Sequence, residues 1–174
     1  MPIYAFEDRV PEISPEAYVH PEATVGGDVV IEAGCYIGPG ARLRADWGSI
    51  RIGRGSNVQE NCVLHVRPTY PILLETDCHI GHSAVLHGCT LRENVLIGIG
   101  AIVLDGVEIG PNCIVGAGSV ITSRVTIPAG KMVWGVPAEI QSDVTSAQLE
   151  AKRRGTGLYQ TLPKRYQESL RRID

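Results

Sequence analysis

A six-residue repeat runs through most of the 174-residue chain and limits what the chain can fold into. Each unit opens with an aliphatic residue, often followed by Gly, and has a small residue at its fifth position, as in IGPNCI, VGAGSV and IGIGAI. A repeat of fixed period sets the architecture of the whole chain, because each unit folds in the same way and packs on its neighbours. The twenty opening residues are Ile13, Val19, Val25, Ile31, Ile37, Leu43, Ile52, Val58, Leu64, Leu74, Ile80, Leu86, Leu91, Ile97, Val103, Ile109, Val115, Ile121, Ile127 and Val133.

Six residues provide one short strand and one corner, so three units close a triangular coil. Successive coils then stack at the ~4.8 Å spacing of neighbouring strands, with the opening residues pointing inward. The fifth position also points inward, where space is tight, and Gly at the second position gives the backbone the freedom that a corner needs. The repeat therefore predicts an all-β fold, a left-handed parallel β-helix of hexapeptide repeats, followed by C-terminal α-helices.

The composition agrees with this fold and narrows the class of protein. Twenty Gly and 11 Pro with a single Phe are typical of short strands and tight corners. The net charge of −3 argues against a nucleic-acid or membrane-surface partner, and no apolar run approaches the ~18 residues of a membrane helix. The opening stretch MPIYAFEDRVPEIS has neither the basic start nor the apolar run of a signal peptide.

The five cysteines form no CxxC pair, which together with their odd number favours a reducing, cytoplasmic setting. Four of them fall at the cramped fifth position of a unit, where a thiol is expected to serve as small apolar filler. These four are Cys35, Cys62, Cys78 and Cys113, whereas Cys89 lies one place off the register.

The repeat stops after Val133, and the sequence divides into a β-helix carrying the site over residues 1–138 and a helical tail over residues 139–174. The stretch DVTSAQLEAKRRG predicts a helix with Thr145 as its N-cap, Gln148 three residues later and Gly155 as its stop. A second amphipathic helix, packed on the β-helix, is predicted from the four-residue spacing of Leu158, Leu162, Tyr166 and Leu170.

Two insertions interrupt the repeat, of three residues after Leu43 and of four residues after Leu64. Both follow units of the same face in successive coils, so we expect them to emerge near one edge. Interruptions of a solenoid tend to be loops on its working face. The two insertions are therefore expected to form the walls of a site.

Three histidines lie within the ten residues HIGHSAVLHG, next to these insertions. Counting units in threes stacks the outward second positions Arg44, His65 and His87 in one column. Two imidazoles one strand apart can bring ring nitrogens to the ~3.3 Å separation of two ligands on one tetrahedral zinc. His79 is expected at a corner or on the surface.

His82 is predicted to lie on a different face, directly over Glu60. It reaches the His65–His87 pair only if three subunits stand side by side about a threefold axis. The His82 of each subunit would then contact the His65–His87 pair of its neighbour. Closed cyclic assemblies of this kind are common. The pattern therefore predicts a homotrimer with three interfacial metal sites.

The chain resembles the γ-class carbonic anhydrases. The run RADWGSIRIGRGSNVQENCVLH followed by HIGHSAVLHGCT covers that family's signature, and the repeat and the helical tail extend the resemblance over nearly the whole chain. It is most similar to the phenylacetate-degradation and carnitine-operon branch, whose GTxxYQ pattern matches Gly155 to Gln160. The resemblance implies Zn²⁺, with Fe²⁺ or Co²⁺ as alternatives, bound by His65, His87 and His82 of the adjacent subunit.

The resemblance also implies roles for other residues. Arg44 and Asp46 match a pair that bridges subunits. Gln59 matches the residue that orients metal-bound water or bicarbonate, and Asn57 lies in the same matched run. Tyr159 matches a tyrosine of the C-terminal tail that approaches the pocket. The sequence departs from the family at position 60, which is Glu in place of the usual Asp. The segment between Leu64 and Leu74 also lacks an acidic residue to match the family's proton-shuttle glutamate.

The leading hypothesis is therefore hydration of CO₂ to bicarbonate by a zinc-bound hydroxide, a carbonic anhydrase-like lyase activity. Gln59 would orient the hydroxide and Glu60 would pass protons to solvent. A second hypothesis keeps the metal and makes the substrate an acyl-CoA thioester, which is hydrolysed. A third is a metal-free acyltransferase with one histidine as general base, and a fourth is a non-catalytic scaffold.

Overall fold

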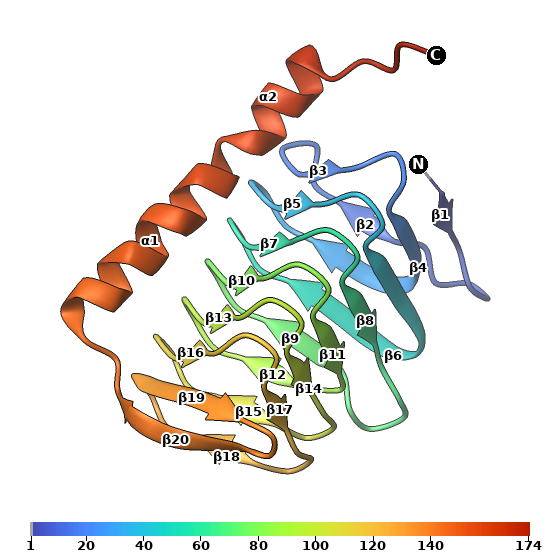
Figure 1. The fold of residues 1–174 in the computed structure, drawn as a ribbon. Coiled ribbons are helices and arrows are strands. Elements are labelled where there is room, and N and C mark those ends of the chain that lie inside the picture. Colours follow the sequence, from blue (N-terminus) through green and yellow to red (C-terminus); the bar gives the residue numbers. More distant parts are fainter. Residues whose placement is uncertain (1) are drawn as a thin grey trace.

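The computed structural model describes residues 2–174 and shows a parallel β-solenoid of about seven turns with a short helical segment at its C-terminus (Figure 1). The predicted left-handed β-helix of hexapeptide repeats is confirmed. Coils stack from the N-terminal end to the C-terminal end, and the two helices run across one side of the stack (Figure 1). No helix within residues 2–174 has both the length and the apolar character needed to cross a membrane.

Two sheets form the three faces of the prism. A 12-stranded sheet covers two faces because β4 (Thr24–Ile31) and β6 (Arg42–Ile52) each continue through a corner. Its other strands are β1 (Ile3–Tyr4), β2 (Glu12–Ile13), β8 (Val63–His65), β9 (Ile72–Leu74), β11 (Val85–His87), β12 (Thr90–Leu91), β14 (Ile102–Val103), β15 (Glu108–Ile109), β17 (Val120–Ile121) and β18 (Thr126–Ile127).

The third face is an 8-stranded sheet in the order β20-β19-β16-β13-β10-β7-β5-β3. Its strands are β3 (Tyr18–Val19), β5 (Tyr36–Ile37), β7 (Asn57–Val58), β10 (His79–Ile80), β13 (Leu96–Ile97), β16 (Ile114–Val115), β19 (Lys131–Gly135) and β20 (Ala138–Asp143). The strand pairing is parallel except between β19 and β20, which pair antiparallel at the C-terminal end.

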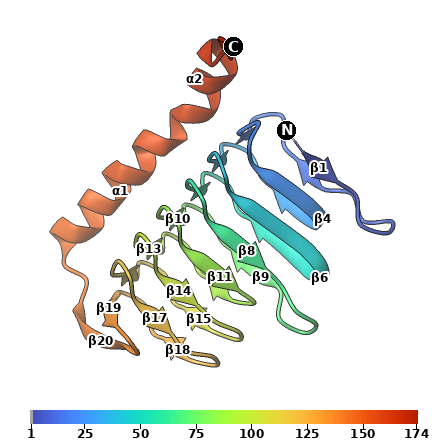
Figure 2. The same cartoon turned by 45° about the vertical axis from the view of Figure 1, so that its right-hand side comes forward.

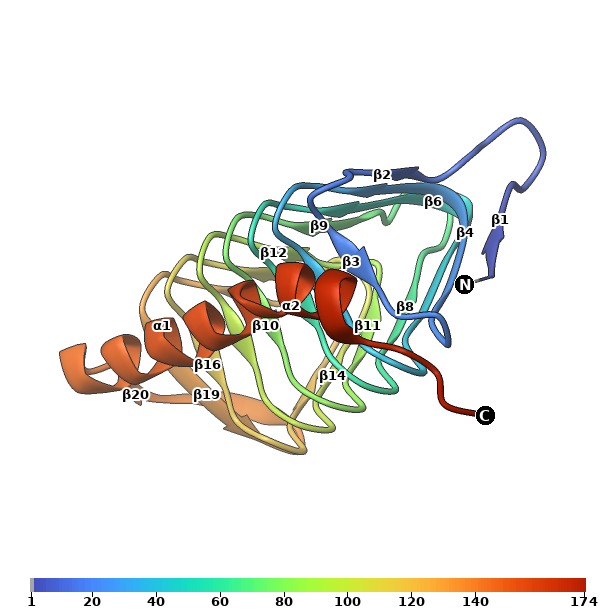
Figure 3. The same cartoon turned by 90° about the horizontal axis from the view of Figure 1, so that it is seen from above.

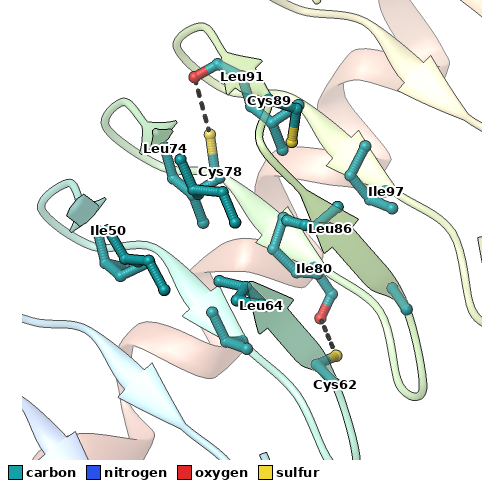
Figure 4. Close-up of a cluster of buried hydrophobic side chains, with 14 of the residues drawn as sticks. Ile50, Cys62, Leu64, Leu74, Cys78, Ile80, Leu86, Cys89, Leu91 and Ile97 are labelled. Atoms are coloured by element: carbon teal, nitrogen blue, oxygen red, sulfur yellow. Dashed lines mark hydrogen bonds between the residues drawn. The ribbon is translucent and has the colours of Figure 1, made fainter. Parts of the chain in front are cut away.

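The interior contains the residues that the repeat places there. The opening residues are buried except for Ile13, which is half-buried, and the predicted fifth-position residues are buried as well. Figure 4 shows part of this interior across several coils, with the Cys78 thiol directed at the carbonyl oxygen of Leu91 and the Cys62 thiol at that of Ile80. The five cysteines are free and buried, which agrees with the expected role of Cys35, Cys62, Cys78 and Cys113 as filler and places Cys89 in the interior as well.

The two insertions lie together at one edge, but only one of them is a loop. The first is absorbed by β6, which runs unbroken for 11 residues from Arg42 to Ile52 and pairs with β4, β8 and β9. The second forms the loop between β8 and β9, closed by a bridge between Arg67 and Tyr70. A Cβ at Gly48 would lie 3.5 Å from the carbonyl oxygen of Arg67, so the two insertions are in contact.

The N-terminal arm, residues 2–10, projects beyond the prism (Figures 2 and 3). Its strand β1 pairs with β4 in parallel at Val25 and Gly26. A bridge between Phe6 and Arg9 then folds the arm back on itself. The arm thus stands beside the face formed by β4, β6 and β8, and forms one wall above that face.

The helical tail confirms the predicted N-cap and the second helix on the β-helix, and corrects the predicted stop. Helix α1 (Ser146–Gln160) begins with the predicted capping box, in which Thr145 accepts from the backbone of Gln148. It continues through Gly155, so the predicted stop there is wrong; α2 (Leu162–Ser169) follows after Thr161. The proposed division between residues 138 and 139 falls at the start of β20 and stays a prediction.

The predicted apolar stripe of the tail is correct only in part. Tyr166 is half-buried and its ring packs against Tyr18 and Tyr36, with centroids 5.1 and 5.6 Å apart, and Leu162 is half-buried as well. Leu158 and Leu170 are instead 70% and 48% exposed, and the buried residues of the two helices are Lys152, Thr156 and Pro163. The Lys152 ammonium donates to Asn94 Oδ1 at 2.6 Å. The outer face of the prism under the tail is polar and tyrosine-rich, so the tail buries groups that can hydrogen-bond to it.

The buried thiols predict a loss of stability in alkaline solution. Burial raises the pKa of Cys62 to about 11 and those of Cys35, Cys78 and Cys89 to about 12, while an unfolded chain ionises them near their ordinary value. Because the folded pKa lies above the unfolded one, this stabilisation is complete below about pH 9 and is lost as the pH rises.

Urea unfolding at pH 8 and pH 10 tests this expectation with Cys62→Ala, which puts at position 62 the residue found at the equivalent positions 41 and 84. The variant should lose roughly 1 kcal/mol less stability over this interval than wild type. Ser119→Ala, at a buried fifth position without a titratable group, should follow wild type. An equal loss in wild type and Cys62→Ala would contradict the assignment.

Candidate functional site

The outer face of β6, β8 and β11 carries the predicted histidine column. Arg44 pairs with His65 and His65 pairs with His87 in the strand register, so the three residues lie on successive coils. The His65 Nδ1 atom lies 2.9 Å from the His87 Nε2 atom. The sequence therefore predicted correctly that these two imidazoles meet.

A carboxylate binds the far side of each ring. His65 Nε2 lies 3.1 Å from Asp46 Oδ1, and His87 Nδ1 lies 2.6 Å from Asp105 Oδ1. Each carboxylate is in turn paired with a guanidinium: Asp46 with Arg44, and Asp105 with Arg67 at 3.3 Å. The six side chains form a continuous row, Arg44–Asp46–His65–His87–Asp105–Arg67.

The row keeps both carboxylates ionised. Partial burial opposes ionisation of Asp46, but hydrogen bonds from Arg44 and His65 outweigh it and lower the pKa of its carboxyl. For Asp105 the same opposition is outweighed by hydrogen bonds from His87 and Arg67, which lower its pKa as well. Burial lowers the pKa of His65 despite its carboxylate partner, so this ring favours the neutral form.

These contacts fix which ring nitrogens carry hydrogen. A carboxylate only accepts, so His65 donates through Nε2 and His87 donates through Nδ1. The facing nitrogens, Nδ1 of His65 and Nε2 of His87, then both present lone pairs. Two lone pairs at this distance repel unless a proton or a metal cation lies between them. The arrangement is therefore a receptor for one positive charge.

A cavity of about 640 Å³ opens over this face, within the ordinary range for small-molecule sites. His65 and His87 line it together with Tyr4 and Phe6 of the N-terminal arm and with Val63 of β8. Its walls are mainly apolar, so a bound molecule would be shielded from water beside the two imidazoles.

The remaining predicted site residues form a second group on the 8-stranded face. Glu60 contacts His82 Nδ1, as predicted, and its Oε1 atom accepts from the Tyr36 hydroxyl at 3.3 Å. The Gln59 amide nitrogen donates to Asn57 Oδ1 at 2.9 Å. Gln59 is only 2% exposed, because its amide is enclosed on the outer side of the sheet between Asn57 and His79.

His79 anchors this second group. It lies at a corner, as one of the two predicted alternatives had it, but the ring is half-buried and not on the surface. The Gln59 amide nitrogen lies 2.7 Å from His79 Nε2, and Tyr159 of α1 packs edge-on against the ring at 5.2 Å between centroids. Burial, with smaller contributions from Lys152 and His82, lowers the pKa of His79 to about 4. The sequence did not show that α1 covers this corner.

One chain thus brings together Arg44, Asp46, His65 and His87 but holds Asn57, Gln59, Glu60, His82 and Tyr159 on another face. Within residues 2–174 of one chain, no three His, Cys, Asp or Glu side chains are grouped so as to hold a metal ion. Arg44 and Asp46, which the resemblance implied would bridge subunits, already pair within one chain. Asp105 was missed, because extending the histidine column by one coil reaches Leu104, and Asp105 is the residue after it.

Comparison with known proteins relates the chain to acyl-transferring proteins. The model of the bacterial transferase hexapeptide family, described as six repeats, matches residues 11–45 and 88–123. The carnitine operon protein CaiE of Citrobacter koseri is 42% identical over 170 residues, which cover 98% of this chain and 86% of that protein. The CaiE protein of Proteus sp. is 39% identical over the same share of both chains.

Two solved structures share the whole fold. A Bacillus cereus protein classed as an acetyltransferase superposes with a TM-score of 0.94 at 33% identity, covering 95% of this chain and 96% of that one. A hexapeptide transferase family protein from Anaplasma phagocytophilum gives a TM-score of 0.91 at 28% identity, with coverages of 95% and 98%. Proteins with these repeats typically form trimers and act on small molecules.

These similarities correct the expected activity. The relatives and structural neighbours are CaiE and acetyltransferases, so the expectation of a carbonic anhydrase-like lyase, with a thioesterase as runner-up, is wrong. The γ-class itself is not shown by the comparisons. The physical reason is that a histidine column identifies a reactive site and not a reaction, since an imidazole that can bind a metal can also serve as a general base.

The half-buried His79 predicts a specific instability in acid. Its folded pKa of about 4 lies below the ordinary value of 6.5, so the unfolded chain takes up a proton first. This stabilisation is complete above pH 6.5 and is lost by roughly 1.4 kcal/mol per pH unit as the pH falls toward 4.

Urea unfolding at pH 7 and pH 5 of wild type and His79→Gln measures this effect. The variant should be less stable at pH 7 but should lose less on acidification. His20→Gln, which removes an imidazole that does not contact His79, serves as the control and should follow wild type. A parallel acid loss in His79→Gln and wild type would show that His79 is not responsible.

Proposed function

Because the chain belongs to the bacterial hexapeptide transferase family, with CaiE proteins among its relatives, we propose that it transfers an acyl group from an acyl-CoA thioester to a small-molecule acceptor. The observation that carries this proposal is the pair of facing ring nitrogens at 2.9 Å, each ring oriented by an aspartate, in the wall of an apolar cavity. General-base catalysis needs a neutral imidazole with an unprotonated nitrogen within reach of the substrate. The two aspartates leave one such nitrogen on each ring, at the place where the two rings meet in the wall of the cavity.

The reaction uses the pair as a store for one proton. An acceptor hydroxyl or amine gives its proton to His87 Nε2 as it attacks the thioester carbonyl. The new bond forms between the acceptor oxygen or nitrogen and the acyl carbon. The carbon–sulfur bond then breaks, and the CoA thiolate leaves with the proton returned by the imidazolium. Asp105 and Asp46 stabilise the positive charge while the pair holds that proton.

We further propose a homotrimer in which His82 of the partner subunit completes the site. His82 lies on a different face from His65 and His87 in one chain, and its side chain is 42% exposed. Ile99, in the following coil of the same face, is 56% exposed. An apolar residue exposed next to a reactive histidine fits a contact between subunits, and a closed threefold assembly would repeat the site three times.

The pair and His82 of the partner subunit are also suited to a divalent cation, which makes metal binding a second candidate function of the same site. A histidine that binds a metal usually donates its other N–H to a carboxylate, which is the arrangement of His65 with Asp46 and of His87 with Asp105. Zn²⁺, with Fe²⁺ or Co²⁺ as alternatives, would supply a Lewis acid that polarises a substrate oxygen. The two functions use the same nitrogens, so metal analysis separates them.

Release of free CoA in the presence of an acceptor tests the transferase proposal. Acetyl-CoA and longer acyl-CoA thioesters are offered with a panel of hydroxyl and amine acceptors. Carnitine is included because the relatives are named for the carnitine operon. Wild type should form acyl-acceptor product, and His87→Gln should lower kcat by roughly 10²–10⁴-fold. His20→Gln should match wild type. Absence of product with every pair, or full activity of His87→Gln, would contradict the proposal.

Elemental analysis after dialysis against Zn²⁺ tests the metal proposal. We expect one ion per subunit in wild type. His82→Ala should lose the ion while keeping its circular dichroism spectrum, and His20→Ala should keep both. Metal-free wild-type protein would refute the cation site and leave a proton taken from the substrate as the charge that the rings accept. Loss of folding in His82→Ala would show that His82 is structural.

A further inference from the structure

The loop between β8 and β9, residues 66–71, has no part in the function proposed so far. It is the second insertion of the repeat and its fold is well defined. The Tyr70 amide donates to the Arg67 carbonyl oxygen at 3.1 Å, and the Arg67 guanidinium lies 5.7 Å from the centre of the Tyr70 ring. The Arg67 and Tyr70 side chains therefore form one unit within the loop. We call the loop of residues 66–71, with this pair, the 66–71 clamp.

The clamp holds Asp105 on one side. The Asp105 carboxylate uses one oxygen for each partner: Oδ1 accepts from His87 Nδ1 at 2.6 Å, and Oδ2 accepts from Arg67 at 3.3 Å. Its side chain is 19% exposed. The carboxylate thus lies between a histidine of the site and an arginine of the clamp, with its plane fixed by both.

The clamp also holds the backbone on which His87 and Asp105 are mounted. Gly88 follows His87 and Gly106 follows Asp105, with φ angles of 57° and 69°. A Cβ at Gly88 would lie 2.7 Å from both Tyr70 Cβ and Asp105 Oδ1, and a Cβ at Gly106 would lie 2.8 Å from Tyr70 Cε1. Tyr70 is therefore seated directly on the two corners, and only glycine leaves room for it.

We propose that Asp105, held by the 66–71 clamp, is a positioning residue that keeps hydrogen on Nδ1 of His87 and so directs the Nε2 lone pair toward His65. The inference rests on the proposed function, because it assigns the lone pair that would accept the substrate proton. It also gives the second insertion a role: the loop fixes the tautomer of the reactive histidine.

The clamp makes the substitution Asp105→Asn unusually informative. The guanidinium of Arg67 only donates, so it favours the amide oxygen of an asparagine at position 105. The amide NH₂ group then faces His87 Nδ1, which must become an acceptor, and the ring hydrogen moves to Nε2. A carboxylate-to-amide change at the orienting residue of a catalytic histidine is known to produce the wrong tautomer in this way.

NMR of protein labelled with ¹⁵N-histidine, freed of metal with a chelator and held at pH 7.5, reads the tautomer directly. In wild type the His87 signals should show Nδ1 carrying hydrogen. In Asp105→Asn most of His87 should instead carry hydrogen on Nε2, and kcat for acyl transfer should fall roughly a hundredfold or more with KM little changed. Asp105→Glu, which restores the carboxylate, should return the Nδ1–H signal and part of kcat.

Two further variants complete the experiment. Asp28→Asn removes the carboxylate of another Asp–Arg pair, with Arg51 at 2.8 Å, and should change neither the His87 signals nor kcat. Arg67→Met leaves Asp105 intact but removes its clamp, and should give a mixture of tautomers. This variant keeps the test valid if Asp105→Asn does not fold.

Unchanged His87 signals in both Asp105→Asn and Arg67→Met would overturn the inference. The tautomer is measured in the resting protein and needs no substrate. Absence of acyl transfer in wild type would therefore defeat the proposed function, while the shift in the His87 signals would still decide the role of Asp105.

Discussion

Inward stacking of one aliphatic residue per six is the constraint on which the rest of the structure depends. Buried residues such as Leu43, Leu64 and Leu86 lie one above another because each coil contributes one opener to each face. Their burial fixes the register of the coils, since a slip of one residue would turn every opener outward. The same register forces the outward residues into columns. The contact between His65 and His87 is thus a consequence of how the interior packs.

The column alone would bring the two imidazoles together without deciding which ring nitrogens carry hydrogen. The aspartates decide this, because each accepts a hydrogen bond from one ring nitrogen and leaves a lone pair on the nitrogen that faces the other ring. The cavity above the pair is lined mainly by apolar groups, among them Phe6 and Val63. A proton taken from a substrate is then stabilised by the whole row from Arg44 to Arg67, in which the remaining charges of the arginines and aspartates balance.

The repeat made the solenoid, the buried thiols and the His65–His87 contact predictable, because each depends only on position within a unit. Features that depend on packing between distant segments were not predictable. Asp105 reaches His87 only because glycine at position 88 leaves space, and His79 is half-buried only because α1 crosses its corner. The reaction class was also mispredicted, since histidines with the same placement suit metal chemistry and general-base chemistry alike. The roles of Gln59, Glu60, Asn57 and Tyr159 remain predictions.

The central claim is that His65 and His87 act as one unit that holds a single positive charge, and a double-mutant cycle on the rate of acyl transfer tests it most directly. The rates of wild type, His65→Gln, His87→Gln and the double variant are compared. Residues that act as a unit give strongly non-additive effects. The account predicts that the double variant is no slower than His87→Gln alone. Losses that multiply, with each substitution costing its full factor in the presence of the other, would show two independent histidines and contradict it.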